Sequence, residues 1–206
     1  MSITRIDLPV TEEKIRALKV GDEIALYGTI VTGRDGAHKL MHEAIDAEHA
    51  GDPSKMKALE FLRPLMKDGF IYHCGPVMKR DGEKWKVVAA GPTTSSREEP
   101  YQAEVIERFG LRGVIGKGGM GPKTGGACQK FGAVYMHGVG GAAVALAAAI
   151  KEVITVHLDD ELGPPEAFWV LRVEDFRGVV TIDSHGGSLH KDVLEESKAA
   201  AAKYFT

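Results

Sequence analysis

Short apolar segments alternate with longer amphipathic or alanine-rich segments along most of the 206 residues of this chain. Runs rich in Val, Ile and Tyr that are bounded by glycine or proline predict strands, and longer runs with apolar residues three and four apart predict helices. Because both kinds follow one another in a continuous pattern, we predict an α/β fold of layered sheets and helices, forming a single domain over residues 1–206.

The expected strands lie at residues 23–31, 70–73, 84–90, 112–115, 133–136, 153–157, 167–173 and 179–183. The expected helices lie at residues 12–18, 34–50, 55–67, 101–109, 142–150 and 191–205. Asp81-Gly82 is a strong turn signal, and we expect it to join strands 70–73 and 84–90.

Charge and cysteine content exclude several functions. The formal net charge is only −3, which gives no long-range attraction to nucleic acid or to an anionic membrane. Two cysteines, Cys74 and Cys128, are too few for a disulfide scaffold or for an iron–sulfur cluster held by this chain alone, and are most simply buried small hydrophobes. The first residues lack the basic and apolar regions of a signal peptide, so we expect a cytoplasmic protein.

Residues 131–150 contain no Asp, Glu, Lys or Arg and have the length of a membrane span. However, His137 and the glycines between Gly138 and Gly141 interrupt them. We therefore predict a buried strand, a turn and a helix, and no membrane insertion.

A hydroxyl-rich segment, Gly91-Pro-Thr-Thr-Ser-Ser-Arg97, follows the apolar end of strand 84–90 and precedes a helix. Hydroxyls and backbone N–H groups at a helix start, with an arginine beside them, suit a carboxylate or phosphate. The alternative is ordinary capping of the helix by Ser or Thr.

A glycine-rich loop covers residues 116–126 and matches G-x-G-x-x-G. No acidic residue follows between Pro122 and Lys151, so the pattern lacks the ribose ligand of a dinucleotide site, and Pro122 interrupts the phosphate-loop pattern. A simple phosphate loop using Lys117 and a purely structural turn both stay open.

The segment Arg34-Asp-Gly-Ala-His38 also follows a predicted strand. His38 and His42 have the spacing of a two-histidine metal site, but the glutamate of H-E-x-x-H is missing, and hydrogen-bonded or solvated histidines are the simpler interpretation. We predict no metal ligands in this chain.

Arg34, Thr93, Arg97 and Lys117 together provide three cations and a hydroxyl, which suit a small dicarboxylate. The chain offers no obvious acid–base pair beside them. It therefore has the features of half an active site.

The segments at residues 34–38, 91–97 and 116–126 resemble the C-terminal part of the iron–sulfur class I fumarases and equally the beta subunit of L(+)-tartrate dehydratase. Two further segments, Cys128-Gln-Lys-Phe131 and Ile182-Asp-Ser-His-Gly186, extend the similarity. The chain departs from the usual pattern at Gly36, at Leu40 and at Glu98-Glu99, where the family often has methionine followed by an acidic residue.

The resemblance implies a swivelling β/β/α domain and a hydro-lyase whose 4Fe-4S cluster is carried by a partner alpha subunit. It implies Thr93 as the base, with Lys117 assisting catalysis, and Arg34, Arg97 and Lys117 as ligands of the substrate's carboxylates. We expect the beta subunit of a fumarate hydratase in a two-plus-two assembly. The alternatives are a tartrate dehydratase beta subunit and a non-catalytic phosphate- or anion-binding module; an NAD-dependent oxidoreductase is the weakest alternative.

Overall fold

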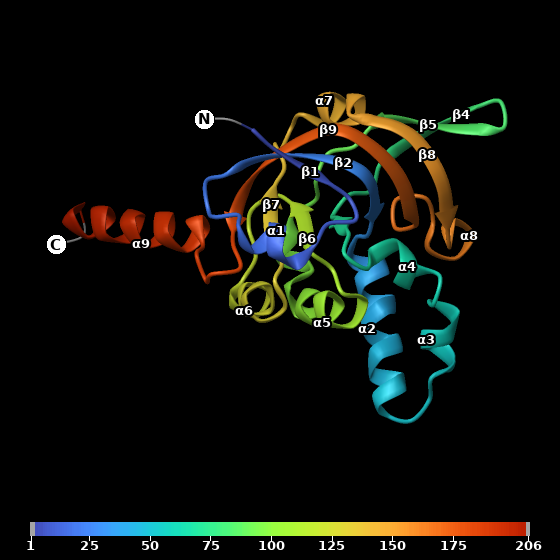
Figure 1. The fold of residues 1–206 in the computed structure, drawn as a ribbon, viewed down its shortest axis with the longest axis horizontal. Coiled ribbons are helices and arrows are strands. Elements are labelled where there is room, and N and C mark those ends of the chain that lie inside the picture. Colours follow the sequence, from blue (N-terminus) through green and yellow to red (C-terminus); the bar gives the residue numbers. More distant parts are fainter. Residues whose placement is uncertain (1–2, 205–206) are drawn as a thin grey trace.

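The computed structural model describes residues 3–204. Its main sheet has seven strands in the order β1-β2-β3-β6-β7-β9-β8 (Figure 1). The strands are Thr4–Asp7 (β1), Glu23–Thr32 (β2), Phe70–Tyr72 (β3), Gly113–Gly116 (β6), Val134–His137 (β7), Ile150–His157 (β8) and Phe168–Ile182 (β9). Because β9 pairs with both β2 and β7, strands β2, β3, β6, β7 and β9 form a closed ring.

The helices are Glu12–Arg16 (α1), Asp35–His49 (α2), Ser54–Ala58 (α3), Leu62–Met66 (α4), Glu99–Phe109 (α5), Pro122–Phe131 (α6), Ala143–Ala148 (α7), Asp159–Leu162 (α8) and Leu189–Ala201 (α9). Two 3₁₀ turns, η1 at Ser95–Arg97 and η2 at Ala202–Tyr204, and a separate hairpin of Val77–Asp81 (β4) and Lys84–Ala89 (β5) complete the described elements. Helix α9 extends away from the body of the molecule (Figure 1). The alternation of strands and helices confirms the predicted α/β class.

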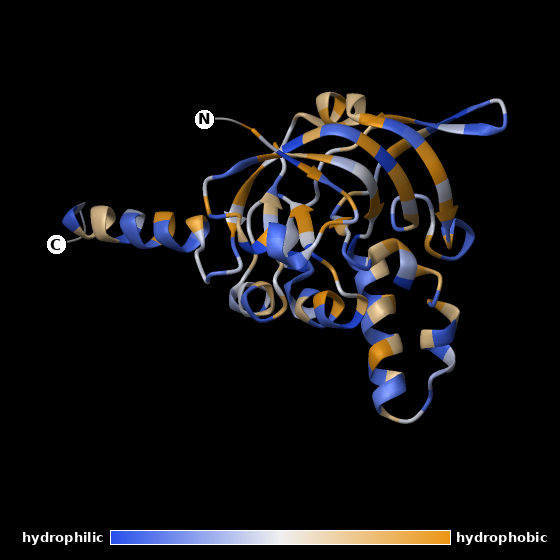
Figure 2. Cartoon of the chain, in the orientation of Figure 1, coloured by the Kyte–Doolittle hydropathy of each residue, from blue (hydrophilic) through white to orange (hydrophobic). Residues whose placement is uncertain are grey.

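Both faces of the parallel strands are buried, which explains their continuous apolar sequences. Successive residues point to opposite faces: Val114 joins the core formed with α2, α5 and α6, whereas Ile115 joins the core enclosed by the ring. The central strands are accordingly hydrophobic in Figure 2, whereas the end of the β4–β5 hairpin and much of α9 are hydrophilic.

Strands β2, β3, β6 and β7 are parallel neighbours. Their carboxyl ends therefore meet at one edge of the sheet, where open α/β sheets usually bind ligands. This carboxyl edge carries the loops that the sequence analysis selected.

The hairpin around Asp81-Gly82 differs from the expectation. It joins Val77–Asp81 (β4) to Lys84–Ala89 (β5) in a separate two-stranded sheet. Strand β3 lies instead between β2 and β6, because its fully buried residues fit the centre of the parallel sheet.

The single helix expected at 55–67 is wrong. The chain forms α3 and α4, separated by a bend that lets Met56 and Leu62 enter the same core. Pro64 lies in the first turn of α4, where its missing N–H costs no helical hydrogen bond.

The two strands expected at 167–173 and 179–183 are one strand, β9, because β2 pairs with it on both sides of the polar Glu174-Asp175 step. The glycine-rich segment is a loop only to Gly121, and its later residues start α6. The terminal helix ends at Ala201, and the expected end at residue 205 lies outside the described residues.

Residues 131–150 form the predicted strand, turn and helix, although the helix is shorter than expected because Ile150 already starts β8. Among residues 3–204, no helix combines the length and the apolar character needed to cross a membrane.

Candidate functional site

The three selected segments meet at the carboxyl edge. Arg34 follows β2 and its side chain lies over Gly75, since a Cβ built there would meet Arg34 Cδ at 2.8 Å. The Thr93 N–H donates to the carbonyl of His73, just after β3 (2.7 Å). The Ser95 N–H donates to the carbonyl of Lys117, just after β6 (3.0 Å). The fold thus brings together the loops that carry Arg34, Thr93, Arg97 and Lys117.

The three cations differ in their partners. Arg97 binds Asp35 (Nη2 to Oδ1, 2.7 Å), and Arg34 lies 3.4 Å from Glu166 (Nε to Oε1). The Asp35 bond raises the pKa of Arg97. Across residues 3–204, no carboxylate lies within ion-pair distance of Lys117. The site therefore contains two arginines that are each paired with a carboxylate, and one lysine that has no carboxylate partner among the described residues.

A network of buried polar side chains lies directly beneath these loops. Gln102 Oε1 lies 2.9 Å from His38 Nε2 and 2.7 Å from His73 Nε2. His73 Nδ1 lies 2.9 Å from Ser95 Oγ, which also accepts from the Tyr135 hydroxyl at 2.9 Å. All five side chains are fully enclosed. We call His38, His73, Ser95, Gln102 and Tyr135 the buried network.

The protonation of the two histidines orients the Gln102 amide. Burial lowers the pKa of His73 to about 3 and lowers that of His38, so each ring is neutral and carries one proton. His38 Nδ1 faces the carbonyl of Arg34 (2.9 Å) and must hold its proton there, which leaves Nε2 as an acceptor. A half-turn of the amide places the Gln102 NH₂ group toward both rings, so that it donates to each Nε2. Sequence reasoning missed this network, because histidines 35 residues apart give no spacing signal.

A carboxylate of the same chain occupies the N-terminus of α6. Glu99 accepts from the N–H groups of Gly121 (2.8 Å) and Lys123 (2.9 Å) and from the Thr124 hydroxyl (2.7 Å). Helix N-termini attract anions, and here Glu99 takes the position that a phosphate would need. The glycine-rich loop thus closes on Glu99.

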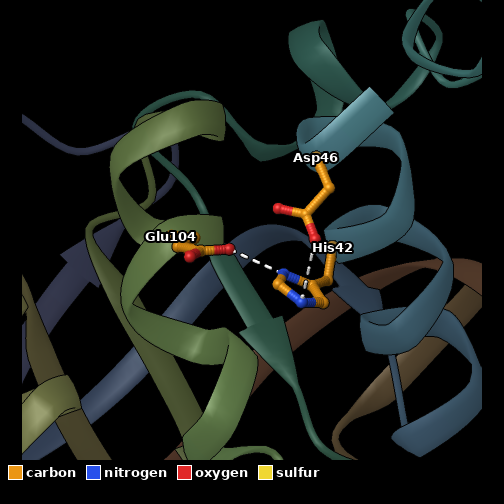
Figure 3. A group of neighbouring side chains, drawn as sticks. All are labelled: His42, Asp46 and Glu104. Carbon is orange, nitrogen blue, oxygen red and sulfur yellow. Dashed lines mark hydrogen bonds and ion pairs between the residues drawn. The ribbon is translucent and has the colours of Figure 1, made fainter. Parts of the chain in front are cut away.

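The two candidate metal ligands separate. His38 belongs to the buried network, whereas His42 lies between Glu104 (Nδ1 to Oε2, 2.8 Å) and Asp46 (Nε2 to Oδ2, 3.4 Å), as Figure 3 shows. Each ring nitrogen of His42 faces a different carboxylate, as in ordinary side-chain hydrogen bonding. The His38–His42 pair does not form a metal site.

Both cysteines are buried and unpaired, in separate cores. Burial raises the pKa of Cys74 and of Cys128 to about 12, so both are neutral thiols. Metal ligation requires thiolates, so these residues serve as small hydrophobes.

A family model and two relatives place the chain in one protein family. A family model described as the fumarase C-terminus matches residues 2–193. A Geobacillus stearothermophilus protein provisionally described as a fumarate hydratase class I is 48% identical over 95% of this chain, which spans only 35% of that protein. The L(+)-tartrate dehydratase subunit beta of Escherichia coli K12 is 40% identical over 95% of this chain and 89% of its own length. The chain therefore belongs to the fumarase C-terminus family.

Proposed function

We propose that this chain, as one domain over residues 1–206, is the beta subunit of a cytoplasmic iron–sulfur-dependent hydro-lyase, in the first instance a fumarate hydratase that interconverts fumarate and L-malate. One observation carries the proposal: in a member of this family, the carboxyl edge gathers the segments bearing Arg34, Thr93, Arg97 and Lys117. Cations around a hydroxyl match a dicarboxylate that must lose a proton beside a carboxylate.

In this proposal, Thr93 takes the proton from the carbon next to a substrate carboxylate. Arg34, Arg97 and Lys117 bind the carboxylates and stabilise the negative charge that develops as the proton leaves. Because Lys117 has no carboxylate neighbour among residues 3–204, its charge is available both to the substrate and to a Thr93 alkoxide.

The residues of this chain do not fit a 4Fe-4S cluster. Cys74 and Cys128 are enclosed neutral thiols in different cores. The cluster would therefore be held by a partner alpha subunit. This chain alone would lack turnover, and two copies of each subunit would form the assembly.

The second candidate is the beta subunit of an L(+)-tartrate dehydratase. The tartrate dehydratase subunit from Escherichia coli K12 matches this chain over 89% of its own length, whereas the fumarase relative is about three times longer than the matched region. The length match thus supports a separate beta subunit through the tartrate relative and not through the fumarase relative. The non-catalytic phosphate-binding alternative loses support, because Glu99 already occupies the N-terminus of α6.

The test is anaerobic co-expression with a cluster-bearing alpha subunit, followed by assays with fumarate, malate and both tartrate enantiomers. We expect turnover of fumarate and malate, and turnover of L(+)-tartrate instead would establish the second candidate. In the active complex, Thr93→Ala should lower kcat by about 10²- to 10⁴-fold, the usual contribution of a general base. Thr93→Ser keeps the hydroxyl and should retain much of the activity. Equal kcat in wild type and Thr93→Ala would rule out Thr93 as the base.

A further inference from the structure

Glu98 is a buried carboxyl group that has no assigned role. It lies between Arg97 and Glu99, and its side chain is 0% exposed. Neither of its carboxyl oxygens has a hydrogen-bond donor among the described residues. An isolated buried carboxylate is strongly disfavoured, because it loses its hydration without compensation.

A second carboxylate acts on Glu98. Asp35 raises the pKa of Glu98 through a side-chain hydrogen bond and its negative charge, and Asp35 is itself bound to Arg97 at 2.7 Å. Two ionised carboxylates in contact repel each other, and neither has a proton with which to form a hydrogen bond to the other. A proton on Glu98 supplies the missing donor, so that the Glu98 hydroxyl can donate to Asp35.

No other side chain that faces Glu98 replaces this proton. His73 Nδ1 is 3.9 Å from Glu98 Oε2, but its ring is neutral and its proton is directed to Ser95. The Tyr135 hydroxyl also donates to Ser95. Arg97 is directed to Asp35. Burial, followed by the hydrogen bond with Asp35, raises the pKa of Glu98 to about 8.

The charge of the candidate site depends on this proton. The site contains three cations, Arg34, Arg97 and Lys117, and two carboxylates paired with the arginines, Glu166 and Asp35, so the group has one excess positive charge when Glu98 is neutral. Ionised Glu98 would cancel that charge. It would also draw Arg97 toward a pair of adjacent carboxylates and away from a substrate.

We propose that Glu98 is a positioning residue held as a neutral acid, whose hydroxyl donates to Asp35 and so fixes the Asp35–Arg97 pair that presents Arg97 to a substrate carboxylate. The link to substrate rests on the proposed function, whereas the proton on Glu98 is inferred independently of that function.

The first experiment measures the proton directly, on the full chain without any partner. Infrared spectroscopy detects the carbonyl stretch of a protonated carboxylic acid. We expect a band at pH 6.5 that disappears as the pH is raised through about 8 and that is absent from Glu98→Gln. Its absence from the wild-type chain at pH 6.5 would overturn the proposal.

The second experiment measures KM and kcat of the assembled enzyme between pH 7 and pH 9. If only the form with neutral Glu98 binds substrate well, KM should rise about tenfold over this range, because the competent fraction falls by that factor. Glu98→Gln keeps a neutral donor and should remove this rise in KM. Glu98→Met keeps the length and the neutrality but has no donor, so its KM should be raised at every pH while kcat is largely kept.

The two proposals can fail separately. A complex without hydro-lyase activity, in which the infrared band still titrates, would overturn the proposed function and support the protonated Glu98. An active complex without the band, or one in which Glu98→Gln shows the same rise in KM as the wild type, would overturn the Glu98 proposal alone.

Discussion

Gly116 shows how a single residue limits the site. It is the last residue of β6, and a Cβ at this position would overlap Ser95 Oγ and would come within 2.9 Å of the Tyr135 hydroxyl. Glycine is therefore required here by close packing against the buried network. The sequence left open a phosphate loop at this glycine. In the structure, Gly116 makes room for the Ser95 side chain.

Replacing Gly116 should displace Ser95 and with it the Thr93 segment. We expect Gly116→Ala to lower the free energy of unfolding by about 1–3 kcal/mol, as overpacking of a filled interior usually does. Urea unfolding of the chain measures this effect. Gly126→Ala is the matched control, since nothing lies within 4 Å of its Cβ position and alanine favours the helix. Equal destabilisation by both variants would contradict the packing argument.

At the scale of elements, α5 and α6 are joined by one carboxylate. Glu99 lies in the first turn of α5 and accepts hydrogen bonds from the start of α6. From the sequence alone, Glu99 is simply an acidic residue near the start of its own helix, where acids are favoured. Only the packing of α5 beside α6 shows that Glu99 caps the neighbouring helix.

Removing this cap should loosen the N-terminus of α6. We expect Glu99→Ala to lower the free energy of unfolding by about 1–2 kcal/mol, the range for loss of a good N-cap. Sulfate at millimolar concentration should restore part of the loss, because the helix N-terminus is then free to bind an anion. Thermal unfolding with sulfate and with chloride measures both effects. Glu107→Ala, on the exposed face of α5, is the control and should show neither effect.

At the scale of the whole molecule, buried titratable groups make stability depend on pH in two directions. His73 is neutral in the fold with a pKa of about 3 against 6.5 when unfolded, so the unfolded chain binds more protons below pH 6.5 and stability is lost as the pH falls. Glu98 is protonated in the fold with a pKa of about 8 against 4.5, so the folded chain binds more protons and stability is lost as the pH rises toward 8.

Stability should therefore decline from pH 7 to about pH 8, a range that lies above the pKa of His73 in both states. Glu98→Gln should remove this decline, because the amide has no proton to lose. Urea midpoints measured across this range compare the two proteins. A wild-type midpoint that is constant over this range would contradict the assignment of a neutral Glu98.

Local sequence patterns were enough to predict the alternation of strands and helices and to place Arg34, Thr93, Arg97 and Lys117 just after predicted strands. These features are local, since hydrophobic period and turn residues act over a few positions. Direct sequence reasoning could therefore predict the α/β class and the candidate segments. It could not predict that Leu62 starts a second short helix or that β9 continues through Glu174-Asp175.

Only the tertiary structure decided which strands pair, how the ring closes through β9, and which polar groups are buried. Gln102 between two histidines, Glu99 at the start of α6 and Glu98 against Asp35 each join segments that are distant in the chain or separated by a loop. Such contacts carry no local signal, because they arise when packing removes polar groups from water and each one must then find a partner. The residues that position the candidate site follow from burial, which is a property of the folded chain as a whole.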